Sequence, residues 1–382
     1  MNIERRFACI AHMEAAAQRR IPRFAWDYMA GGIGRERMLA ENIARLDRVK
    51  LRPRYLVDDA DAPDTAHSLF GVDYPLPFGV APLGLSGLIW PAAAEHLARA
   101  ARDQGIPFTL SGMATSSIEQ IGAIGGHLWY QHYATNDVAI NSDLLERAHR
   151  AGFEVLMVTV DIPTATRRDR DIRNGLSVPP ALDLRTLGDI LARPAWALAM
   201  LRQGMPEFLN LKPYLPARLS LSELGVQLSE LIEGHVSIDK LRWYRQQWPG
   251  KLIVKGILDA AEARACVDIG ADAIVVSNHG GRQLDAAQTS VDALPSLRAA
   301  VGDEFPLLAD GGIRNGLDIA RYLALGADFV LLGRAFMFAL GAIGSGGCVH
   351  AMSVLQAELR STLAQLGCSN IRRLPEFLIR EE

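Results

Sequence analysis

The stretch SNHGGRQLD at residues 277–285 combines side chains that could act together on one small acid. It directly follows the apolar run 273–276, which is typical of a buried strand. His279 could act as a general base near neutral pH, and Arg282 carries a planar guanidinium that suits a carboxylate. The glycines between them permit a tight turn, so that both side chains could face one ligand. A solvated turn would not require this combination.

Two further segments contain candidate partners for His279 and Arg282. Asp161 follows another apolar run and could orient His279 and stabilise its protonated form. Arg168, in the same segment, is a candidate for a second carboxylate contact. Lys255 ends the apolar run 252–254, and its ammonium could stabilise negative charge on a cofactor. The other charged residues near Arg168 are expected to form a solvated cluster: Arg167, Asp169, Arg170 and Asp171.

Glycine-rich segments with a basic residue close two more apolar runs. They are ADGGIRNG at 309–316 and LLGRA at 331–335. In α/β barrels, backbone amides and a basic residue after the last strands commonly bind phosphate. The residues that fit this arrangement are Gly311, Gly312, Arg314, Gly333 and Arg334. Together with Lys255, they predict a phosphate-bearing cofactor whose reactive ring lies near an ammonium group.

The elements that must position these residues form a regular series. From about residue 76, short apolar runs alternate with segments rich in Ala, Leu, Glu and Arg at helical spacing. The expected strands are 77–82, 107–111, 128–133, 154–161, 251–256, 273–278, 306–312 and 328–334. This series predicts a (β/α)8 TIM barrel, in which polar residues at the carboxyl ends of all strands converge on one face. The alternative, a doubly wound sheet, would carry a phosphate-binding glycine fingerprint after its first strand, which residues 79–82 do not supply.

Length and composition are compatible with one domain spanning residues 1–382, because 49% of the residues are hydrophobic. The net charge of −3 argues against a nucleic-acid partner. The four cysteines lack metal-ligand spacing and are expected to be reduced, space-filling thiols. We see no signal peptide and no run of roughly 18–20 apolar residues, so a soluble or membrane-surface protein is expected. Residues 1–20 are expected to form an amphipathic surface helix.

A long insert, about residues 175–240, separates the fourth and fifth expected strands. Its stretch 185–218 carries five Lys or Arg against two Asp or Glu, together with large apolar residues. Two interpretations stay open. The insert is either a lid or helical excursion that packs on the barrel, or a basic, apolar segment that binds a membrane surface.

The motifs SNHGGRQLD, VKG, DGG and LGR, in this order and spacing, resemble those of the FMN-dependent 2-hydroxy acid oxidoreductases. That family includes glycolate oxidase, lactate oxidase and the bacterial lactate and mandelate dehydrogenases. The resemblance extends from FAWDYMAGG at 24–32 to the C-terminal helices. It implies FMN-dependent oxidation of an (S)-2-hydroxy acid, mandelate- or lactate-like, to the 2-oxo acid, with electrons passed to a quinone or another membrane acceptor. The alternative is an oxidase that returns electrons to oxygen and releases hydrogen peroxide.

The resemblance also implies roles for the catalytic candidates. His279 would take the substrate proton, and Asp161 would support the resulting imidazolium. Lys255 would stabilise the reduced, anionic flavin ring. A non-catalytic flavin-binding scaffold would be expected to have lost one of these residues or Arg282, and all are present.

The binding residues are implied in the same way. Arg282 and Arg168 would bind the substrate carboxylate, and Tyr28 and Tyr133 would contact its carboxylate or hydroxyl. The residues expected to line the flavin ring and ribityl chain are Pro82, Leu83, Gly84, Ser111, Gln131, Thr159 and Ser277. The residues expected to hold the ribityl and phosphate groups are Asp310, Gly312, Arg314, Gly333 and Arg334.

Several positions distinguish the chain within that family. Gly84 stands where the oxidases generally carry alanine, and Met113 replaces a bulky tryptophan, which would admit a larger, aromatic substrate side chain. The insert segment PAWALAMLRQGMP resembles the membrane-associating segment of mandelate dehydrogenase. The resemblance therefore implies a cytoplasmic protein, peripheral on the inner face of the cell membrane, and a homo-oligomer, since family members are often tetramers. His132 in QHY and the charged TATRRDRD depart from the usual pattern, and both bear on side-chain specificity.

Overall fold

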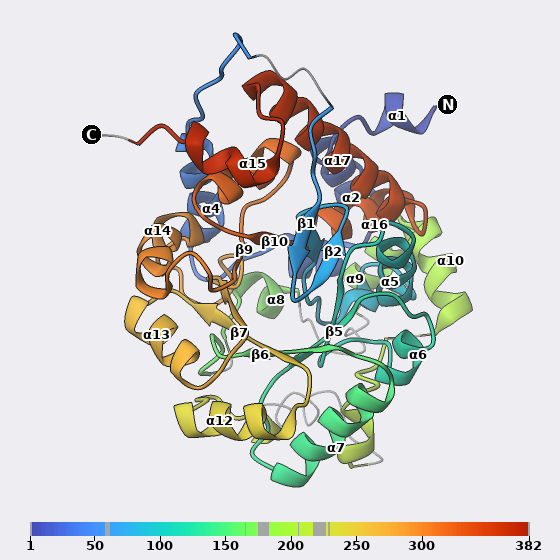
Figure 1. Ribbon diagram of the computed structural model, residues 1–382. Coiled ribbons are helices and arrows are strands. Elements are labelled where there is room, and N and C mark those ends of the chain that lie inside the picture. The colour runs from blue at the N-terminus through green and yellow to red at the C-terminus, as the bar shows by residue number, and fades with distance from the viewer. Residues whose placement is uncertain are drawn as a thin grey trace.

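The computed structural model describes residues 2–57, 62–164, 166–174, 183–204, 206–216, 227 and 230–380. Within these ranges, eight parallel strands close into a barrel in the order β10-β3-β4-β5-β6-β7-β8-β9 (Figure 1). The strands are β3 (Phe78–Val80), β4 (Phe108–Ser111), β5 (Leu128–His132), β6 (Val155–Thr159), β7 (Lys251–Ile257), β8 (Ala273–Val276), β9 (Leu307–Asp310) and β10 (Phe329–Leu332). Each expected strand corresponds to one of these, so the predicted TIM barrel is confirmed.

The barrel strands are apolar along their whole length because both of their faces are buried. In β6, Val155 and Met157 belong to the cluster that fills the barrel interior, whereas Leu156 and Val158 pack in the core under the surrounding helices. The parallel register places polar residues beside each other at the open end. Ser111 of β4 pairs with Gln131 of β5, and Thr159 of β6 pairs with Lys255 of β7.

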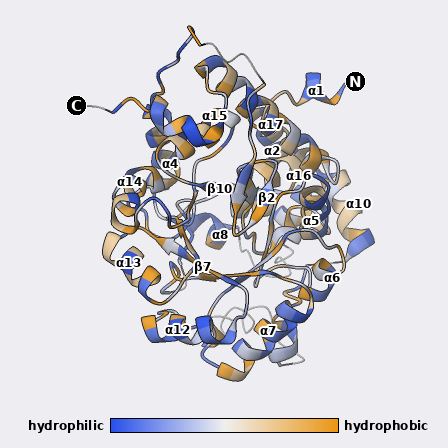
Figure 2. Cartoon of the chain, viewed as in Figure 1, coloured by the Kyte–Doolittle hydropathy of each residue, from blue (hydrophilic) through white to orange (hydrophobic). Residues whose placement is uncertain are grey.

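Helices surround the barrel, and most of them carry both hydrophobic and hydrophilic residues (Figure 2). The helices between and after the strands are α5 (Ala93–Asp103), α6 (Ile118–Gly122), α7 (Val138–Arg150), α12 (Ile238–Gln247), α13 (Ala260–Asp268), α14 (Ser290–Val301), α15 (Gly316–Ala324), α16 (Arg334–Ile343) and α17 (Gly347–Leu366). Short 3-10 helices are η1 (Ser86–Leu88), η2 (Lys212–Tyr214) and η3 (Ile371–Phe377). The cysteines are free thiols, and Cys266, Cys348 and Cys368 are buried, as expected for space-filling residues.

A hairpin that the sequence did not predict closes the amino-terminal end of the barrel. Its strands, β1 (His67–Leu69) and β2 (Val72–Tyr74), pair antiparallel and lie over the barrel centre in Figure 1. The Tyr74 ring lies 5.6 Å from the Phe329 ring, and the Phe70 ring lies 6.2 Å from the Trp129 ring. The hairpin therefore covers the end opposite the carboxyl ends of the strands.

The N-terminal segment forms more than the single surface helix that was predicted. It contains α1 (Ile3–Arg6), α2 (Ile10–Arg20), α3 (Arg23–Ala30) and α4 (Arg37–Arg48). The chain leaves helical geometry at Phe7, which is buried, before α2 begins. Helix α2 packs closely on α16, because a Cβ atom on Gly341 would lie only 2.9 Å from the Cβ atom of Ala17. Helix α2 is the amphipathic surface helix that was expected, because it buries Ile10, Met13 and Ala17 while its other residues are exposed or half-buried. The expectation was wrong only in its extent, since α1 and α2 are separate helices.

The described part of the insert is helical and packs partly on the barrel. It contains α9 (Leu184–Leu191) and α10 (Pro194–Gln203), whereas α8 (Asp169–Arg173) precedes the insert and α12 leads into β7. Trp196 of α10 is buried, donates a hydrogen bond to the Leu88 carbonyl at 3.1 Å and lies edge-on to Phe24. Residues 175–182, 205, 217–226 and 228–229 of the predicted insert lie outside the described residues. No helix in the described ranges is long and apolar enough to cross a membrane.

Candidate active site

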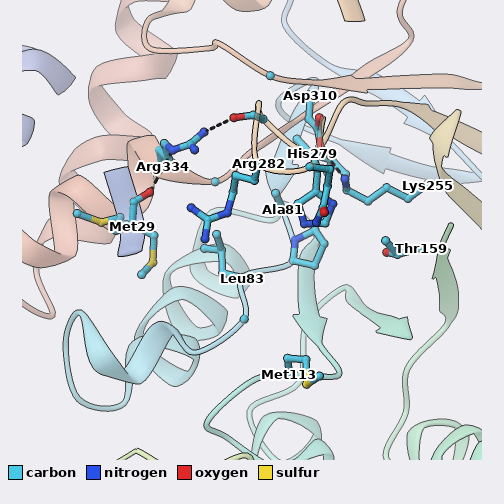
Figure 3. Close-up of a pocket in the computed structure, with 18 of the residues that line it drawn as sticks. Met29, Ala81, Leu83, Met113, Thr159, Lys255, His279, Arg282, Asp310 and Arg334 are labelled. Atoms are coloured by element: carbon cyan, nitrogen blue, oxygen red, sulfur yellow. Dashed lines mark hydrogen bonds and ion pairs between the residues drawn. The ribbon is translucent and has the colours of Figure 1, made fainter. Parts of the chain in front are cut away.

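The carboxyl ends of the barrel strands surround a cavity of about 390 Å³ (Figure 3). This volume is in the range of small-molecule and cofactor sites. The predicted residues that line it are Tyr28, Pro82, Leu83, Gly84, Tyr133, Thr159, Arg168, Lys255, His279, Arg282, Asp310, Gly312, Arg314, Gly333 and Arg334. Four other predicted residues, Ser111, Gln131, Asp161 and Ser277, lie behind this wall and bond to each other or to residues in it.

His279 and Asp161 form a hydrogen-bonded pair at the cavity. Nδ1 of His279 lies 2.9 Å from Oδ1 of Asp161. Burial is the main influence on the pKa of His279 and lowers it below 6.5, although Asp161 acts in the opposite direction. Burial would raise the pKa of Asp161, but His279 and Lys255 outweigh it and lower that pKa. At neutral pH the pair is therefore a neutral imidazole that donates from Nδ1 to a carboxylate and presents Nε2 as a proton acceptor.

The backbone of the SNHGG turn explains why the motif contains glycine. His279 has a φ of +57°, and Gly280 and Gly281 follow with φ values of +63° and +75°. Three consecutive residues in the left-handed region are accessible at low cost only where glycine dominates. The Ser277 hydroxyl accepts a hydrogen bond from the His279 amide at 3.0 Å, which supports the strained residue. The turn thus fixes the position of the His279 ring.

Lys255 is the centre of a buried, charged group under the cavity. Its Nζ atom donates to the Ser277 hydroxyl at 2.8 Å and lies 3.1 Å from Oδ2 of Asp310. The Ser277 hydroxyl in turn donates to Oδ1 of Asp310 at 2.6 Å. Burial would lower the pKa of Lys255, but Asp310 and Asp161 raise it above its ordinary value. The ammonium is therefore charged and held in place at the cavity wall.

Two arginines and two tyrosines form a positively charged end of the cavity. Nη1 of Arg282 donates to the carbonyls of Tyr28 and Gly31 at 2.7 and 2.9 Å, and its guanidinium lies over the Tyr28 ring. Burial and the neighbouring Arg168 lower the pKa of Arg282 to about 10, so that it remains charged at neutral pH. The Nε atom of Arg168 is buried without a hydrogen-bond partner among the described residues. This end of the cavity suits an anion such as a carboxylate.

Of the four charged residues around Arg168 that were expected to form a solvated cluster, Arg167 and Asp169 are exposed as expected, whereas Arg170 and Asp171 are partly buried and form ion pairs. Arg170 forms ion pairs with Asp27 and Glu36, and the Asp27 side chain is 10% exposed. Asp171 pairs with Arg168 at 3.6 Å. These contacts attach α8 to α3, the helix that carries Tyr28. The expectation failed for Arg170 because its partners, Asp27 and Glu36, lie far earlier in the sequence, where no local pattern connects them to this segment.

Gly84 and Met113, both singled out from sequence, lie next to each other at the cavity. A Cβ atom on Gly84 would lie 3.3 Å from the Cβ atom of Met113, so an alanine would require a shift of a few tenths of an ångström. The Leu85 amide also donates to the Met113 carbonyl at 2.8 Å. The loops after β3 and β4 therefore contact each other and form one continuous part of the cavity wall.

Sequence reasoning missed several cavity residues. They are Met29, Ala81, Ile89, Ile162, Thr166, Phe208, Ile232, Gly280, Gln283, Ile313, Leu331, Leu332 and Met337. Gln283 belongs to the SNHGGRQLD motif, and both atoms of its amide are buried without a partner among the described residues. That position could have been found from the motif, whereas Phe208 and Ile232 come from the insert and carry no such signal.

His132, the departure in QHY, does not line the cavity. Its Nε2 atom lies 2.9 Å from Oδ1 of Asn141 and 3.1 Å from the Tyr244 hydroxyl, in a buried polar cluster under α7 and α12. The Asn141 side chain also accepts from the Thr135 amide and donates to the Thr135 carbonyl. The contribution of His132 is therefore structural packing, and a direct effect on substrate side chains was wrongly expected.

We expect this cluster to make the protein sensitive to acid. Burial lowers the pKa of His132 to about 4, from 6.5, so the unfolded chain binds more protons between these values. Stability is therefore lost as the pH falls from 6.5 towards 4, by on the order of 2–3 kcal/mol in total. Urea unfolding at pH 7 and pH 5 measures this loss, and His132→Gln, which cannot titrate, should lose less. Equal losses in both proteins would show that His132 does not contribute.

Comparison with known proteins defines the family. A family model described as FMN-dependent dehydrogenase matches residues 17–381. The chain is 40% identical over 366 residues to an L-lactate dehydrogenase of Caulobacter sp. (strain K31), which covers 95% of this chain and 96% of that protein. The crystal structure of the monotopic membrane protein (S)-mandelate dehydrogenase matches with a TM-score of 0.93 and 34% identity, covering 98% of this chain and 100% of that chain. A structure of mandelate oxidase matches with a TM-score of 0.83 and 33% identity over 98% of each chain.

The chain therefore belongs to the FMN-dependent dehydrogenase family. It is an FMN-dependent dehydrogenase of the 2-hydroxy acid class, as the sequence motifs had indicated.

The residues present fit an FMN group. Nε2 of Gln131 and Oγ1 of Thr159 are buried and unpartnered in the described structure, at the ends of two adjacent strands. Such polar atoms normally have partners, and a flavin ring edge would supply them. At the other end, burial and neighbouring arginines hold the pKa of Arg334 well below its usual value, which a phosphate dianion would reverse. Arg334 itself is held by the carbonyls of Met29, Gly280 and Gly31 (Figure 3).

Proposed function

We propose that the chain oxidises an (S)-2-hydroxy acid, mandelate- or lactate-like, to the 2-oxo acid and passes the electrons to a quinone or another membrane acceptor. The observation that carries this proposal is the convergence, on one cavity, of a neutral His279–Asp161 pair with Arg282, Arg168 and Lys255. Buried guanidinium groups can hold the carboxylate of a 2-hydroxy acid while a neighbouring base removes a proton from the same molecule. Bound FMN supplies the acceptor for the two electrons that leave the substrate.

Each side chain has a role in this reaction. Arg282 and Arg168 grip the substrate carboxylate, and Tyr28 and Tyr133 contact its carboxylate or hydroxyl. His279 takes the substrate proton at Nε2, while Asp161 stabilises the imidazolium that forms. Lys255 places its positive charge where negative charge develops on the cofactor.

The cofactor contacts are proposed from the same placement. The ring and ribityl contacts are Pro82, Leu83, Gly84, Ser111, Gln131, Thr159 and Ser277. The ribityl and phosphate contacts are Asp310, Gly312, Arg314, Gly333 and Arg334.

Anaerobic stopped-flow reduction of the bound flavin tests the proposal. L-lactate or (S)-mandelate should bleach the flavin absorbance, and the (R)-acids at equal concentration should not. If no 2-hydroxy acid bleaches the flavin, the proposed function is wrong.

An oxidase is the second candidate, because a mandelate oxidase shares the fold at a TM-score of 0.83. The two activities differ in how the reduced enzyme is reoxidised. A dehydrogenase should react faster with a quinone analogue than with air-saturated buffer and should release little peroxide. Rapid, stoichiometric peroxide release would favour the oxidase.

A membrane contact is supported by the exposed face of the insert. Leu184, Leu187 and Leu191 repeat along α9 with exposed fractions of 90, 44 and 70%, and Leu198 and Leu201 of α10 are 50 and 83% exposed. A relative with the same fold is described as a monotopic membrane protein. Helix α10 also lies at the outer edge of the molecule (Figure 1). We infer that the protein is peripheral on the inner, cytoplasmic face of the cell membrane. That it forms a homotetramer stays a prediction.

Replacing these five leucines by serine should release the protein from membranes. Each buried leucine contributes about 1.5–3 kcal/mol at full burial, so even partial insertion of five side chains makes vesicle affinity fall at least tenfold. Co-sedimentation with anionic phospholipid vesicles measures this effect. Leu56→Ser, at another fully exposed leucine, is the matched control. A wild-type protein that never sediments with vesicles would contradict the membrane contact.

A further inference from the structure

The cavity lining includes apolar residues that follow β4 and β6 or belong to the insert. Met113 follows β4, Ile162 follows β6, and Phe208 and Ile232 come from the two sides of the undescribed part of the insert. None of these four side chains carries charge. They contrast with the arginines at the charged end of the same cavity.

Phe208 is held in place by a buried asparagine two residues later. Asn210 is fully buried, accepts a hydrogen bond from the Ile118 amide at 2.8 Å and donates to the Ser116 carbonyl at 3.2 Å. Ser116 lies in the connection between β4 and α6, three residues after Met113, and Ile118 is the first residue of α6. The insert is therefore fastened to the same loop that carries Met113, and Phe208 is a fixed part of the wall.

Ile232 is held next to the end of β5. It forms an isolated antiparallel bridge with Thr135, and the Glu233 amide donates to the Ala134 carbonyl at 2.8 Å. The Asn136 amide donates to the Leu231 carbonyl at 3.0 Å. These backbone bonds place Ile232 beside the segment that begins with Tyr133.

We propose that Phe208 and Ile232 determine substrate specificity by enclosing the C2 substituent of the hydroxy acid. The proposal rests on the proposed function and names its substrate class: 2-hydroxy acids with an aromatic or branched aliphatic side chain. The carboxylate is fixed at the arginines, so the substituent at C2 is the part left to meet the apolar wall. A methyl group, as in lactate, leaves Phe208 and Ile232 largely without contact. A charged substituent would lose its hydration against the wall.

The size of the effect follows from apolar recognition in general. One methylene in an apolar pocket changes kcat/KM by roughly 10–200-fold. A phenyl or isobutyl group adds several carbons to the methyl of lactate. The ratio of kcat/KM for (S)-mandelate to that for L-lactate is therefore expected to exceed ten in the wild-type holoenzyme.

The test is a substrate panel assayed with a soluble dye as electron acceptor. It contains L-lactate, (S)-2-hydroxy-4-methylpentanoate, (S)-mandelate and (S)-malate, whose side chain is charged. Phe208→Ala and Ile232→Ala should each lower the mandelate-to-lactate ratio at least tenfold, chiefly through KM for mandelate. Phe208→Leu should restore part of the ratio, and Lys212→Ala, an exposed change in the same segment, should leave it unchanged.

The outcomes separate this inference from the proposed function. If no member of the panel reduces the flavin, the proposed function fails. If lactate reduces the flavin as efficiently as mandelate, or if Phe208→Ala lowers all substrates in proportion, only the specificity inference is overturned. Flavin content and melting temperature identify a variant that does not fold. If Phe208→Ala does not fold, the mandelate-to-lactate ratio of kcat/KM in Phe208→Leu decides the test.

Discussion

His279→Gln is expected to lower the rate of flavin reduction by at least about a thousandfold while FMN stays bound. General-base catalysis typically contributes 10²–10⁴, and the glutamine also loses the imidazolium that Asp161 stabilises. His279 lies at the cavity, whereas the proposed phosphate contacts come from other strands, so cofactor binding should survive. Anaerobic stopped-flow measures the reduction rate, and the flavin spectrum measures the cofactor content.

Two further measurements make this prediction specific. His12→Gln, at an exposed histidine of α2, should reduce the flavin at the wild-type rate. Because burial lowers the pKa of His279 below 6.5, kcat/KM of the wild type should fall on the acid side only below that pH. Near-normal reduction by His279→Gln would remove the residue from its proposed role.

Arg282→Met is expected to lower kcat/KM by a hundredfold or more, with a higher KM and a lower kcat. In the proposed role the guanidinium pairs with the substrate carboxylate in a buried site, where a charge-assisted contact is strong, so its loss should affect ground state and transition state unequally. The wild type should also prefer a 2-hydroxy acid over its methyl ester, and the variant should lose this preference. Steady-state kinetics with both compounds measure the change.

The control for Arg282→Met must separate a loss of carboxylate binding from a loss of stability. Arg282 also holds the carbonyls of Tyr28 and Gly31, so the melting temperature must be compared. Arg264→Met, at an exposed arginine of α13, is the matched change. An Arg282→Met enzyme that still discriminates acid from ester as the wild type does would exclude Arg282 from carboxylate binding.

The barrel and most of its cavity were predictable because parallel strands obey simple rules. Fully buried strands are continuous apolar runs, and polar residues such as Lys255 and Thr159 stand out at their ends. The in-register pairing then places these ends side by side. Asp161 could be assigned to His279 on the same reasoning, and the structure confirms their contact.

The parts that sequence did not predict depend on distant contacts. Strands β1 and β2 have three residues each, which is too short for alternating hydrophobicity to be recognised. Phe70 at their turn takes a φ of +57°, and because it is not glycine the sequence does not mark this turn. Phe208 reaches the cavity because Asn210 bonds to a loop more than ninety residues earlier, with sequence separations of 92 and 94. No local pattern encodes such a contact.

The hairpin of β1 and β2 has a consequence for access to the site. It covers the amino-terminal end of the barrel, and the cavity lies at the carboxyl ends of the strands. A hydroxy acid is therefore expected to reach His279 from the side of the barrel that carries Tyr28 and the insert residue Phe208, and not through the hairpin end.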